Sequence, residues 1–432
     1  MKVFLVASPL AGHLSPLLSI ARILVAEGHD ILCLSGSDFK DLVERAGAAF
    51  REFGAAADVN QMQSTEVTDE LKRTPPGVQR LRVAIQRRFI ELAPAQHAKI
   101  LEALKDFSAD LIIGDSMMFG LLPIILRSKS TRPPVILCGT SILHSQREDG
   151  SPPFIGLPPA QDHVERKRYA DIAQKFNVQF EHPIAQRLRE LGIGPLQTSL
   201  FNAMVELPDA FLQLTVPGFE FPMKLPRSVH FVGALPIIPD QAPLPPWSSD
   251  LDGSRKVVLV TQGTVANNDL NLLVAPTLAA LANRPDVLVV VTTGGRPLEA
   301  IPGPHYENVR AATYLPFEWL LPKVDVLVTN GGYGTVNQAL SFGIPLVTAG
   351  LTEDKADVNA RVTWSGAGID LKTNAPEATD IREAVLTVLG EPEYRAHASS
   401  LAKEFSSFDS RSAILDIVKD LTHGPSTERK TY

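Results

Sequence analysis

The sequence predicts an α/β protein of two halves, each a parallel sheet covered by helices. Short apolar runs without a period of two alternate with helical stretches along the chain, as buried parallel strands and their crossovers do. A proline-rich segment, residues 236–255, has no helical or strand period and reads as a linker. The length of 432 residues also favours more than one domain. Two such halves predict a cleft lined by the loops that follow strands.

The first half, residues 1–235, opens with a strand over 2–8 and a helix over 16–28, for which Ser15 is the expected N-cap, Pro16 the first helical residue and Gly28 the stop. Further strands are predicted at 30–36, 109–115, 133–140 and 227–235. Helices are predicted at 80–106 with a break at Pro94, around 164–175, and at 197–207. Residues 55–80 lack a period and are predicted as a loop, and the rest of 141–225 as irregular.

The second half, residues 256–408, repeats the pattern. Strands are predicted in RKVVLVTQGT, DVLVVVTTGG, NVRAATYL, DVLVTNGG and IPLVTAG, with helices near 269–283 and between the last two strands. Helices at 379–390, 392–406 and 409–422 follow, and residues 409–432 form a separate terminal helix and tail.

Composition excludes several classes of protein. A hydrophobic content of 44% and a charged content of 21% rule out a wholly disordered chain. The net charge of -7 gives no support for a nucleic-acid partner. Cys33 and Cys138 both lie in apolar strand-like runs and are expected to be buried thiols in a reducing compartment. Neither a signal peptide nor an apolar stretch of membrane-spanning length is found, so we expect a cytoplasmic protein.

Two candidate catalytic residues follow strands of the first half. His13 lies between the first strand and the helix that follows, where the helix dipole favours a neutral imidazole that can act as a base. Asp115 ends the strand over 109–115, and if the two strands are neighbours its carboxylate could accept a hydrogen bond from His13 and stabilise the imidazolium. The alternatives are a histidine that satisfies a tight turn and an aspartate that caps a helix.

A glycine-rich turn, NGGYGT at 330–335, connects a strand to a helix in the second half. Its glycines let backbone N–H groups approach a ligand, and the helix start favours an anion. The turn matches neither a P-loop nor a G-x-G-x-x-G pattern, so it predicts a diphosphate cradle of another kind, with packing as the alternative. The residues concerned are Asn330, Gly331, Gly332, Gly334 and Thr335.

Two further strand-end loops carry polar residues. Glu353 and Asp354 follow the next strand and could accept hydrogen bonds from sugar hydroxyls, or form a solvated helix start. Thr264 follows the first strand of the second half and could donate to a phosphate, or cap the next helix. No D-x-D motif or metal-ligand spacing occurs in these loops, which predicts a site without a metal.

The ordered motifs resemble a known family. The run A-G-H-L-S-P, followed between Tyr314 and Arg361 by Y-L-P, T-N-G-G-Y-G-T, Q-A-L, G-I-P, E-D-K and N-A-R, resembles the nucleotide-sugar-dependent small-molecule glycosyltransferases of family 1, in their bacterial macrolide and rhamnosyl-type branch. The resemblance covers nearly the whole chain. It implies the GT-B fold, two Rossmann-like domains facing a cleft, and a nucleoside-diphosphate sugar as co-substrate with no other cofactor.

The resemblance implies a role for each matching residue. His13 falls on the general base and Asp115 on its orienting partner. Asn330, Gly332 and Thr335 fall on the diphosphate positions and Gln338 on the ribose position; Asp354, with Glu353 or Lys355, falls on the pair that holds the donor sugar, and Tyr314 or Phe317 stacks on the base. Gly12, Gly331, Gly334 and Thr264 complete the expected donor site.

The chain departs from the family pattern at three positions. The family usually has histidine at Asn330, glutamate at Gln338 and glutamine at Lys355. Because an amide offers one accepting oxygen where a carboxylate offers two, uridine and deoxythymidine donors both stay open, with uridine favoured. The donor sugar cannot be read from Lys355.

The acceptor is expected to reach the site through the first half. Residues 55–95 and 141–225 are free to line its pocket, and we expect a hydrophobic small molecule there, in contact with His144, Asp149 and Phe154. The alternative for such residues is ordinary core packing. The last helix is expected to pack back on the first half.

The predicted reaction is inverting transfer of a hexose to an acceptor hydroxyl by a monomer or weak dimer. Two alternatives remain. One is a non-catalytic sugar-nucleotide-binding partner protein, which would have lost the base or its partner. The other is a nucleotide-sugar epimerase, which would need further acid and base groups.

Overall fold

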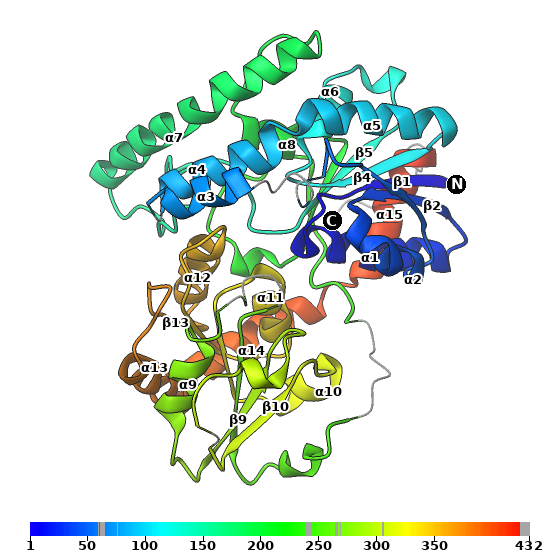
Figure 1. Ribbon diagram of the computed structural model, residues 1–432. Helices are drawn as coiled ribbons and strands as arrows, with labels where there is room; N and C mark the ends of the chain where they lie inside the picture. Colours follow the sequence, from blue (N-terminus) through cyan, green and yellow to red (C-terminus); the bar gives the residue numbers. More distant parts are fainter. Residues whose placement is uncertain are drawn as a thin grey trace.

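The computed structural model describes residues 1–58, 60, 65–75, 77–237, 244–263, 267, 269–304 and 306–423. Within these residues the chain forms two all-parallel sheets flanked by helices (Figure 1). The strand orders are β3-β2-β1-β4-β5-β6-β7 and β10-β9-β8-β11-β12-β13. The predicted α/β class with two parallel sheets is therefore confirmed.

The first sheet is formed by β1 (Lys2–Val6), β2 (Asp30–Ser35), β3 (Ala49–Glu52), β4 (Leu111–Asp115), β5 (Val135–Gly139), β6 (Ala210–Gln213) and β7 (Val229–Phe231). Its helices are α1 (Ala11–Ala26), α2 (Lys40–Arg45), α3 (Thr65–Arg73), α4 (Val78–Ile85), α5 (Ala93–Asp106), α6 (Leu122–Ile125), α7 (His163–Glu190) and α8 (Leu200–Glu206).

The second sheet is formed by β8 (Lys256–Thr261), β9 (Val287–Thr292), β10 (Val309–Ala312), β11 (Val326–Thr329), β12 (Leu346–Thr348) and β13 (Gly368–Asp370). Its helices are α9 (Val274–Leu281), α10 (Phe317–Leu320), α11 (Tyr333–Ser341), α12 (Lys355–Trp364), α13 (Ala378–Gly390) and α14 (Pro392–Ser406); α15 (Ser410–His423) follows.

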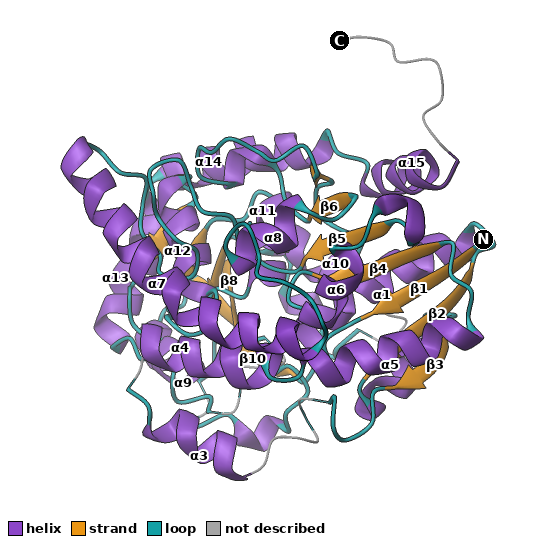
Figure 2. Cartoon of the chain, turned by 90° about the horizontal axis from the view of Figure 1, so that it is seen from above, coloured by secondary structure: helices purple, strands orange, loops and turns teal. Residues whose placement is uncertain are grey.

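Helices cover both faces of the first sheet. Successive residues of a strand point to opposite faces, and in β1 the residues on both faces are apolar. Phe4 and Val6 of β1 share a buried cluster with apolar residues of α4, α5, α7 and α8, whereas Val3 and Leu5 share one with residues of α1, α2 and α15. Figure 2 shows the helices around the strands of this sheet. Both faces are therefore dry, which explains the near-continuous apolar runs of these strands.

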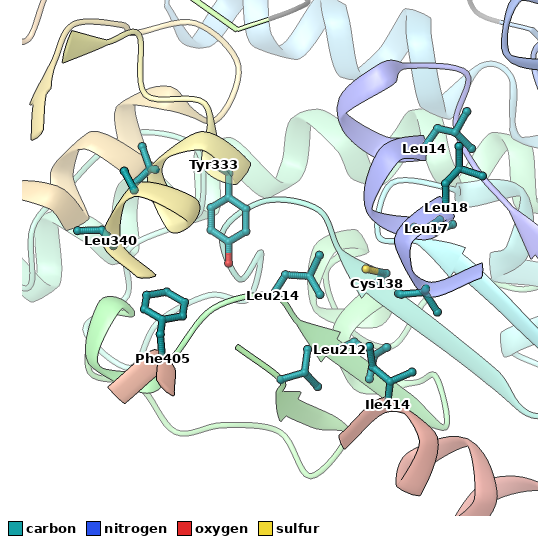
Figure 3. Packing of buried hydrophobic residues seen from close by; sticks show 14 of the residues in the cluster. Leu14, Leu17, Leu18, Cys138, Leu212, Leu214, Tyr333, Leu340, Phe405 and Ile414 are labelled. Atoms are coloured by element: carbon teal, nitrogen blue, oxygen red, sulfur yellow. The ribbon is translucent and has the colours of Figure 1, made fainter. Parts of the chain in front are cut away.

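One apolar cluster continues from the first half into the second. Figure 3 shows Leu212 and Leu214 of the first half near Tyr333 of α11, with Phe405 of α14 beyond. Ile414 of α15 is buried in the same cluster, and Arg411 of that helix pairs with an acidic residue at the end of α1. The two halves are thus joined by shared core as well as by the linker.

Helix α1 begins earlier than predicted. Its first turn forms on the carbonyl of Leu10, which accepts from the N–H groups of His13 (2.9 Å) and Leu14 (3.0 Å). Ser15 is therefore not the N-cap, and Pro16 lies inside the helix. The consequence is that His13 belongs to the first helical turn rather than to the loop before it. Gly28, at φ +78°, ends the helix as predicted.

Other local predictions were wrong where elements are short or polar. Residues 55–80, predicted as a loop, contain α3. This helix has only two apolar residues, Val67 and Leu71, one turn apart, so its sequence shows little helical period. Strands β3, β6 and β13 have only three or four residues and were not predicted. Helix α7 extends far beyond 164–175 because Phe176, Phe180 and further apolar residues continue its buried face. Residues 238–243 of the linker and 424–432 of the tail lie outside the described residues.

Candidate active site

Both sheets place their chemistry at the point where the strand order reverses. In the first sheet β1 and β4 are neighbours although β2 and β3 lie between them in sequence, and in the second sheet β8 and β11 are related in the same way. Ligands of open parallel sheets bind in the crevice beyond the carboxyl ends of such strand pairs. His13 and Asp115 lie beyond the carboxyl ends of the first strand pair, and the turn over 330–332 lies beyond those of the second.

His13 and Asp115 form a hydrogen-bonded pair. The Nδ1 atom of His13 lies 2.9 Å from Oδ1 of Asp115. The buried carboxylate also accepts from the backbone N–H groups of Ser8 (2.6 Å) and Met117 (3.0 Å). Burial alone would raise the pKa of Asp115, but the His13 ring and these N–H groups outweigh it and lower that pKa.

An ionised carboxylate only accepts hydrogen bonds, so Nδ1 of His13 carries the proton of this pair and Nε2 is left free to take another. The His13 side chain is 21% exposed, so the pair is not sealed inside the first half. The Oγ1 atom of Thr140, just after β5, lies 3.4 Å from Nδ1. An imidazole held in one orientation by a buried carboxylate is an arrangement that can accept a proton at its free nitrogen.

Aromatic side chains lead away from His13 into the first half. The ring centroids of His13 and Phe89 are 5.6 Å apart, and those of Phe154 and Phe201 are 5.3 Å apart. The full row runs through Phe89, Phe119, Phe201, Phe154 and His144. All four phenylalanines are buried in the apolar core of the first half, and Phe89, which contacts His13, and Phe154 are the least buried of them at 9% and 8% exposed.

His144 is a buried polar group within this row. Its ring is 3% exposed, and its Nε2 atom has no hydrogen-bond partner among the described residues. Burial, together with the nearby positive charges of His13 and Arg361, lowers the pKa of His144 to about 3. The side chain is therefore neutral at ordinary pH.

The glycine-rich turn in the second half is shaped for close approach. Gly331 has φ +90°, and a Cβ atom there would lie 1.9 Å from the side-chain oxygen of Asn359. Gly332 is the N-cap residue of α11, and among the described residues no side chain caps this helix. Gly334 is exposed with no described atom near its missing Cβ, and Thr335 is partly exposed beside it. Free N–H groups at an open helix start can receive an anion.

The loops after β8 and β12 hold this turn in place. Asn330 donates from Nδ2 to the backbone oxygen of Gln262 at 2.9 Å. A Cβ atom at Gly350, which precedes the acidic loop, would lie 2.2 Å from the backbone oxygen of Asn330. The start of the acidic loop therefore lies against the glycine-rich turn.

The acidic loop contacts the first half directly. Asp354 accepts a hydrogen bond from Oγ of Ser141, the residue after Thr140 in the first half. Burial raises the pKa of Asp354. Glu353 pairs with Nζ of Lys355, so the expected sugar-holding residues are tied to one another and to the first half.

The two candidates for base stacking differ in exposure. Tyr314 is 59% exposed and donates its hydroxyl to the backbone oxygen of Gly294 at 3.4 Å, beside the end of β9. Phe317 opens α10 and packs against the shared core. Tyr314 is thus the one whose ring is available to a ligand.

The remaining predicted residues differ in how the structure places them. Gly12 is exposed with an open position for a Cβ, and Gln338 is partly buried on α11. Both carboxylate oxygens of Asp149 are used within its own loop, where they accept from Arg147 and backbone N–H groups. Thr264 lies outside the described residues. Among the described residues, no three His, Cys, Asp or Glu side chains gather to hold a metal ion.

Sequence reasoning missed the contacts between the halves. Glu220 forms a buried ion pair with Arg361 at 2.7 Å, and the guanidinium of Arg361 lies 4.3 Å from the centroid of the Phe221 ring. Gln213 donates to the hydroxyl of Tyr333 at 2.7 Å. Arg361 belongs to the N-A-R motif, but nothing local to the sequence indicates its partner.

Comparisons with known proteins agree with this architecture. Residues 277–421 match the family described as erythromycin biosynthesis protein CIII-like, C-terminal domain. The chain is 39% identical to 4'-demethylrebeccamycin synthase of Lentzea aerocolonigenes over 98% of this chain and 99% of that protein. It is 33% identical to UDP-glycosyltransferase 2 of Phaeomoniella chlamydospora over 97% and 95% of the two chains.

Solved structures share the fold. The calicheamicin glycosyltransferase CalG4 superposes with a TM-score of 0.72 at 21% identity over 98% of both chains. The glycosyltransferase VinC, solved in complex with dTDP, superposes with a TM-score of 0.68 at 19% identity over 98% of this chain and 100% of VinC. No helix among the described residues has the length and apolarity needed to cross a membrane. Given the identity to relatives along nearly the whole chain and the shared GT-B fold, this protein belongs to the macrolide-type family of small-molecule glycosyltransferases and is a glycosyltransferase.

Proposed function

We propose that the protein is an inverting glycosyltransferase that moves a hexose from a nucleoside-diphosphate sugar to a hydroxyl of a hydrophobic small molecule. One observation carries this proposal. Adjacent residues Thr140 and Ser141 contact His13 and Asp354, so the candidate base and a candidate sugar-holding carboxylate lie on either side of one dipeptide. A reacting carbon between the two halves would be within reach of both.

The proposed donor is a UDP-sugar, with a dTDP-sugar as the second candidate. Relatives named UDP-glycosyltransferase and UDP-glucosyltransferase, at 33% and 31% identity, support uridine. A dTDP-sugar is the second candidate because VinC was solved with dTDP and because Gln338 has a single accepting oxygen for the ribose. The base would stack on Tyr314, and the diphosphate would lie over the turn at 330–335.

The mechanism follows from the positions of the charges. Nε2 of His13 removes the acceptor's hydroxyl proton while Asp115 stabilises the imidazolium that forms. The acceptor oxygen attacks the anomeric carbon from the side opposite the diphosphate, the bond to the diphosphate oxygen breaks, and the configuration inverts. The free N–H groups at the start of α11 stabilise the negative charge that grows on the leaving group. Because these groups supply the stabilisation, we propose that transfer needs no metal.

The proposal is tested with a donor panel and one substitution. UDP- and dTDP-sugars are ranked by thermal shift, because a ligand bound only by the folded state raises the apparent stability. His13→Ala is then expected to keep donor binding near normal and to lose nearly all acceptor-dependent release of the nucleoside diphosphate. NMR of the product from an α-linked donor should show a β-glycoside, and EDTA should leave the rate unchanged.

Three results would contradict parts of this proposal. Transfer that survives in the His13→Ala variant would remove the base assignment. An α-glycoside would remove inversion. Conversion of the donor sugar without an acceptor would instead indicate an epimerase. Analytical ultracentrifugation tests the expected monomer or weak dimer.

A further inference from the structure

The loop between β5 and α7 crosses from the first half towards α12 of the second. Arg147 braces it by donating to the backbone oxygens of Leu157 (2.6 Å) and Pro158 (2.9 Å). Within it, Phe154 has φ +73°, a left-handed conformation that a residue with a branched or bulky side chain rarely adopts. Such a conformation persists only where the surrounding structure holds it.

Asp357 of α12 holds this loop from the opposite half. Its Oδ2 atom accepts from the backbone N–H of Phe154, and its Oδ1 atom accepts from that of Gly156 at 3.0 Å. Asp357 is 3% exposed, so these bonds are shielded from water. Gly156 lies directly on α12, since a Cβ atom there would be 2.7 Å from the backbone oxygen of Ala356. Two independent features therefore fix the loop on this helix.

The conformation that Asp357 holds turns the ring of Phe154 into the aromatic row. Its centroid lies 4.5 Å from that of His144 and 5.3 Å from that of Phe201. The same helix α12 has Asp354 as its N-cap residue, and Asp354 contacts Ser141. One short segment of the second half thus contacts both the expected sugar-holding loop and the wall of the expected acceptor site.

We propose that Asp357 is a positioning residue that acts from the donor-binding half to set the acceptor-binding wall, by holding the Phe154 loop in its left-handed conformation. This inference rests on the proposed function. Its consequence is that acceptor affinity depends on a residue that does not touch the acceptor. Because both carboxylate oxygens of Asp357 accept N–H groups of the first-half loop, we expect release of that loop to change acceptor binding more than donor binding.

The sharpest test replaces one oxygen of Asp357. Asp357→Asn keeps the shape but offers a single accepting oxygen and turns an amide N–H₂ towards one of two N–H donors. Glu404→Gln is the control, because Glu404 also accepts an N–H of the first half, that of Gly218 at 2.9 Å, while within the described part of the chain only one of its carboxylate oxygens accepts a hydrogen bond. Asp357→Asn is expected to raise the KM for the acceptor about tenfold, with the Kd for UDP within twofold, whereas Glu404→Gln changes neither.

Two further measurements separate positioning from a general loss of structure. Native-state hydrogen exchange, which needs no substrate, should show faster exchange of the Phe154 and Gly156 amides in Asp357→Asn. In a Phe154→Gly background, where the residue adopts φ +73° without strain, Asp357→Asn should add less than twofold to the acceptor KM. Gly156→Ala should reproduce the acceptor defect of Asp357→Asn. Rates are measured with UDP-glucose and whichever of umbelliferone and quercetin wild type glycosylates faster.

The outcomes distinguish this inference from the proposed function. Unchanged exchange of the two amides in Asp357→Asn overturns the inference whatever the activity. Faster exchange with an unchanged acceptor KM, or full additivity with Phe154→Gly, overturns it while wild-type transfer leaves the proposed function intact. Absence of acceptor-dependent UDP release in wild type, with bound UDP seen by thermal shift, counts against the proposed function and against the role of Asp357 in acceptor binding.

Discussion

The pairing of His13 with Asp115 predicts a large effect of Asp115→Asn on transfer. Both carboxylate oxygens are engaged, Oδ2 by the N–H of Ser8 and Oδ1 by His13 and by the N–H of Met117. An amide cannot satisfy this set. If its N–H₂ group faces His13, the ring must accept at Nδ1 and carry its proton on Nε2, where it cannot act as a base.

The magnitude can be worked from the geometry. With contact atoms 2.9 Å apart, the charge centres of the imidazolium and carboxylate are roughly 4 Å apart, which gives an attraction of about 4 kcal/mol at an effective dielectric constant of about 20. Loss of that term from the transition state corresponds to a rate about 10³-fold lower. The wrong tautomer of His13 is expected to lower the rate further. In a Ser-His-Asp triad, replacing the aspartate by asparagine produces the wrong tautomer and lowers kcat about 10⁴-fold in total.

The assay is acceptor-dependent release of the nucleoside diphosphate at saturating donor, with the Kd for UDP measured separately. Ser8→Ala is the matched control, because it removes only the hydroxyl contact to the same carboxylate, at 3.2 Å, and keeps the charge and the backbone N–H. We expect kcat of Asp115→Asn to fall at least 10³-fold with UDP affinity retained, and Ser8→Ala to stay within about tenfold of wild type. Transfer by Asp115→Asn within tenfold of wild type would show that the carboxylate does not support the base.

Three further outcomes follow from the structure. Burial lowers the pKa of His144 to about 3, so between pH 6.5 and pH 3 the folded state binds fewer protons than the unfolded state, and the free energy of unfolding should fall by about 1.4 kcal/mol for each unit by which the pH falls. Urea titrations at several pH values should show a smaller loss of stability in acid for His144→Phe than for wild type. An equal pH dependence of the two proteins would contradict the burial of a neutral His144. Tyr314→Ala should weaken UDP binding by about 1–3 kcal/mol while Phe317→Ala mainly lowers Tm, and calorimetry that finds the reverse assigns the stacking to Phe317. Gly331→Ala should destabilise the fold because its Cβ would collide with an asparagine of α12, whereas Gly334→Ala should melt like wild type, and equal Tm values would refute the proposed shape of the turn.

The sequence alone determined the class of the fold and the residues that follow the central strands. Long buried strands such as β1, β8 and β9 are legible because a dry parallel strand is a continuous apolar run. The position of His13 after one strand and of the turn at 330–332 after another places each at the carboxyl edge of its sheet, whatever the order of the strands. The sequence failed at the start of α1, since a backbone carbonyl, and not Ser15, receives the first helical hydrogen bonds.

Only the tertiary structure decided which of these residues meet. Whether His13 reaches Asp115 depends on β1 pairing with β4, and the order of strands has no local signature. The contacts of Asp357 with Phe154, of Asp354 with Ser141 and of Arg361 with Glu220 join residues 141 to 213 positions apart. The hydrophobic period of a segment shows which of its faces is buried. The residue that it meets in the other half depends on how the two halves pack together, and no single segment of the sequence encodes that.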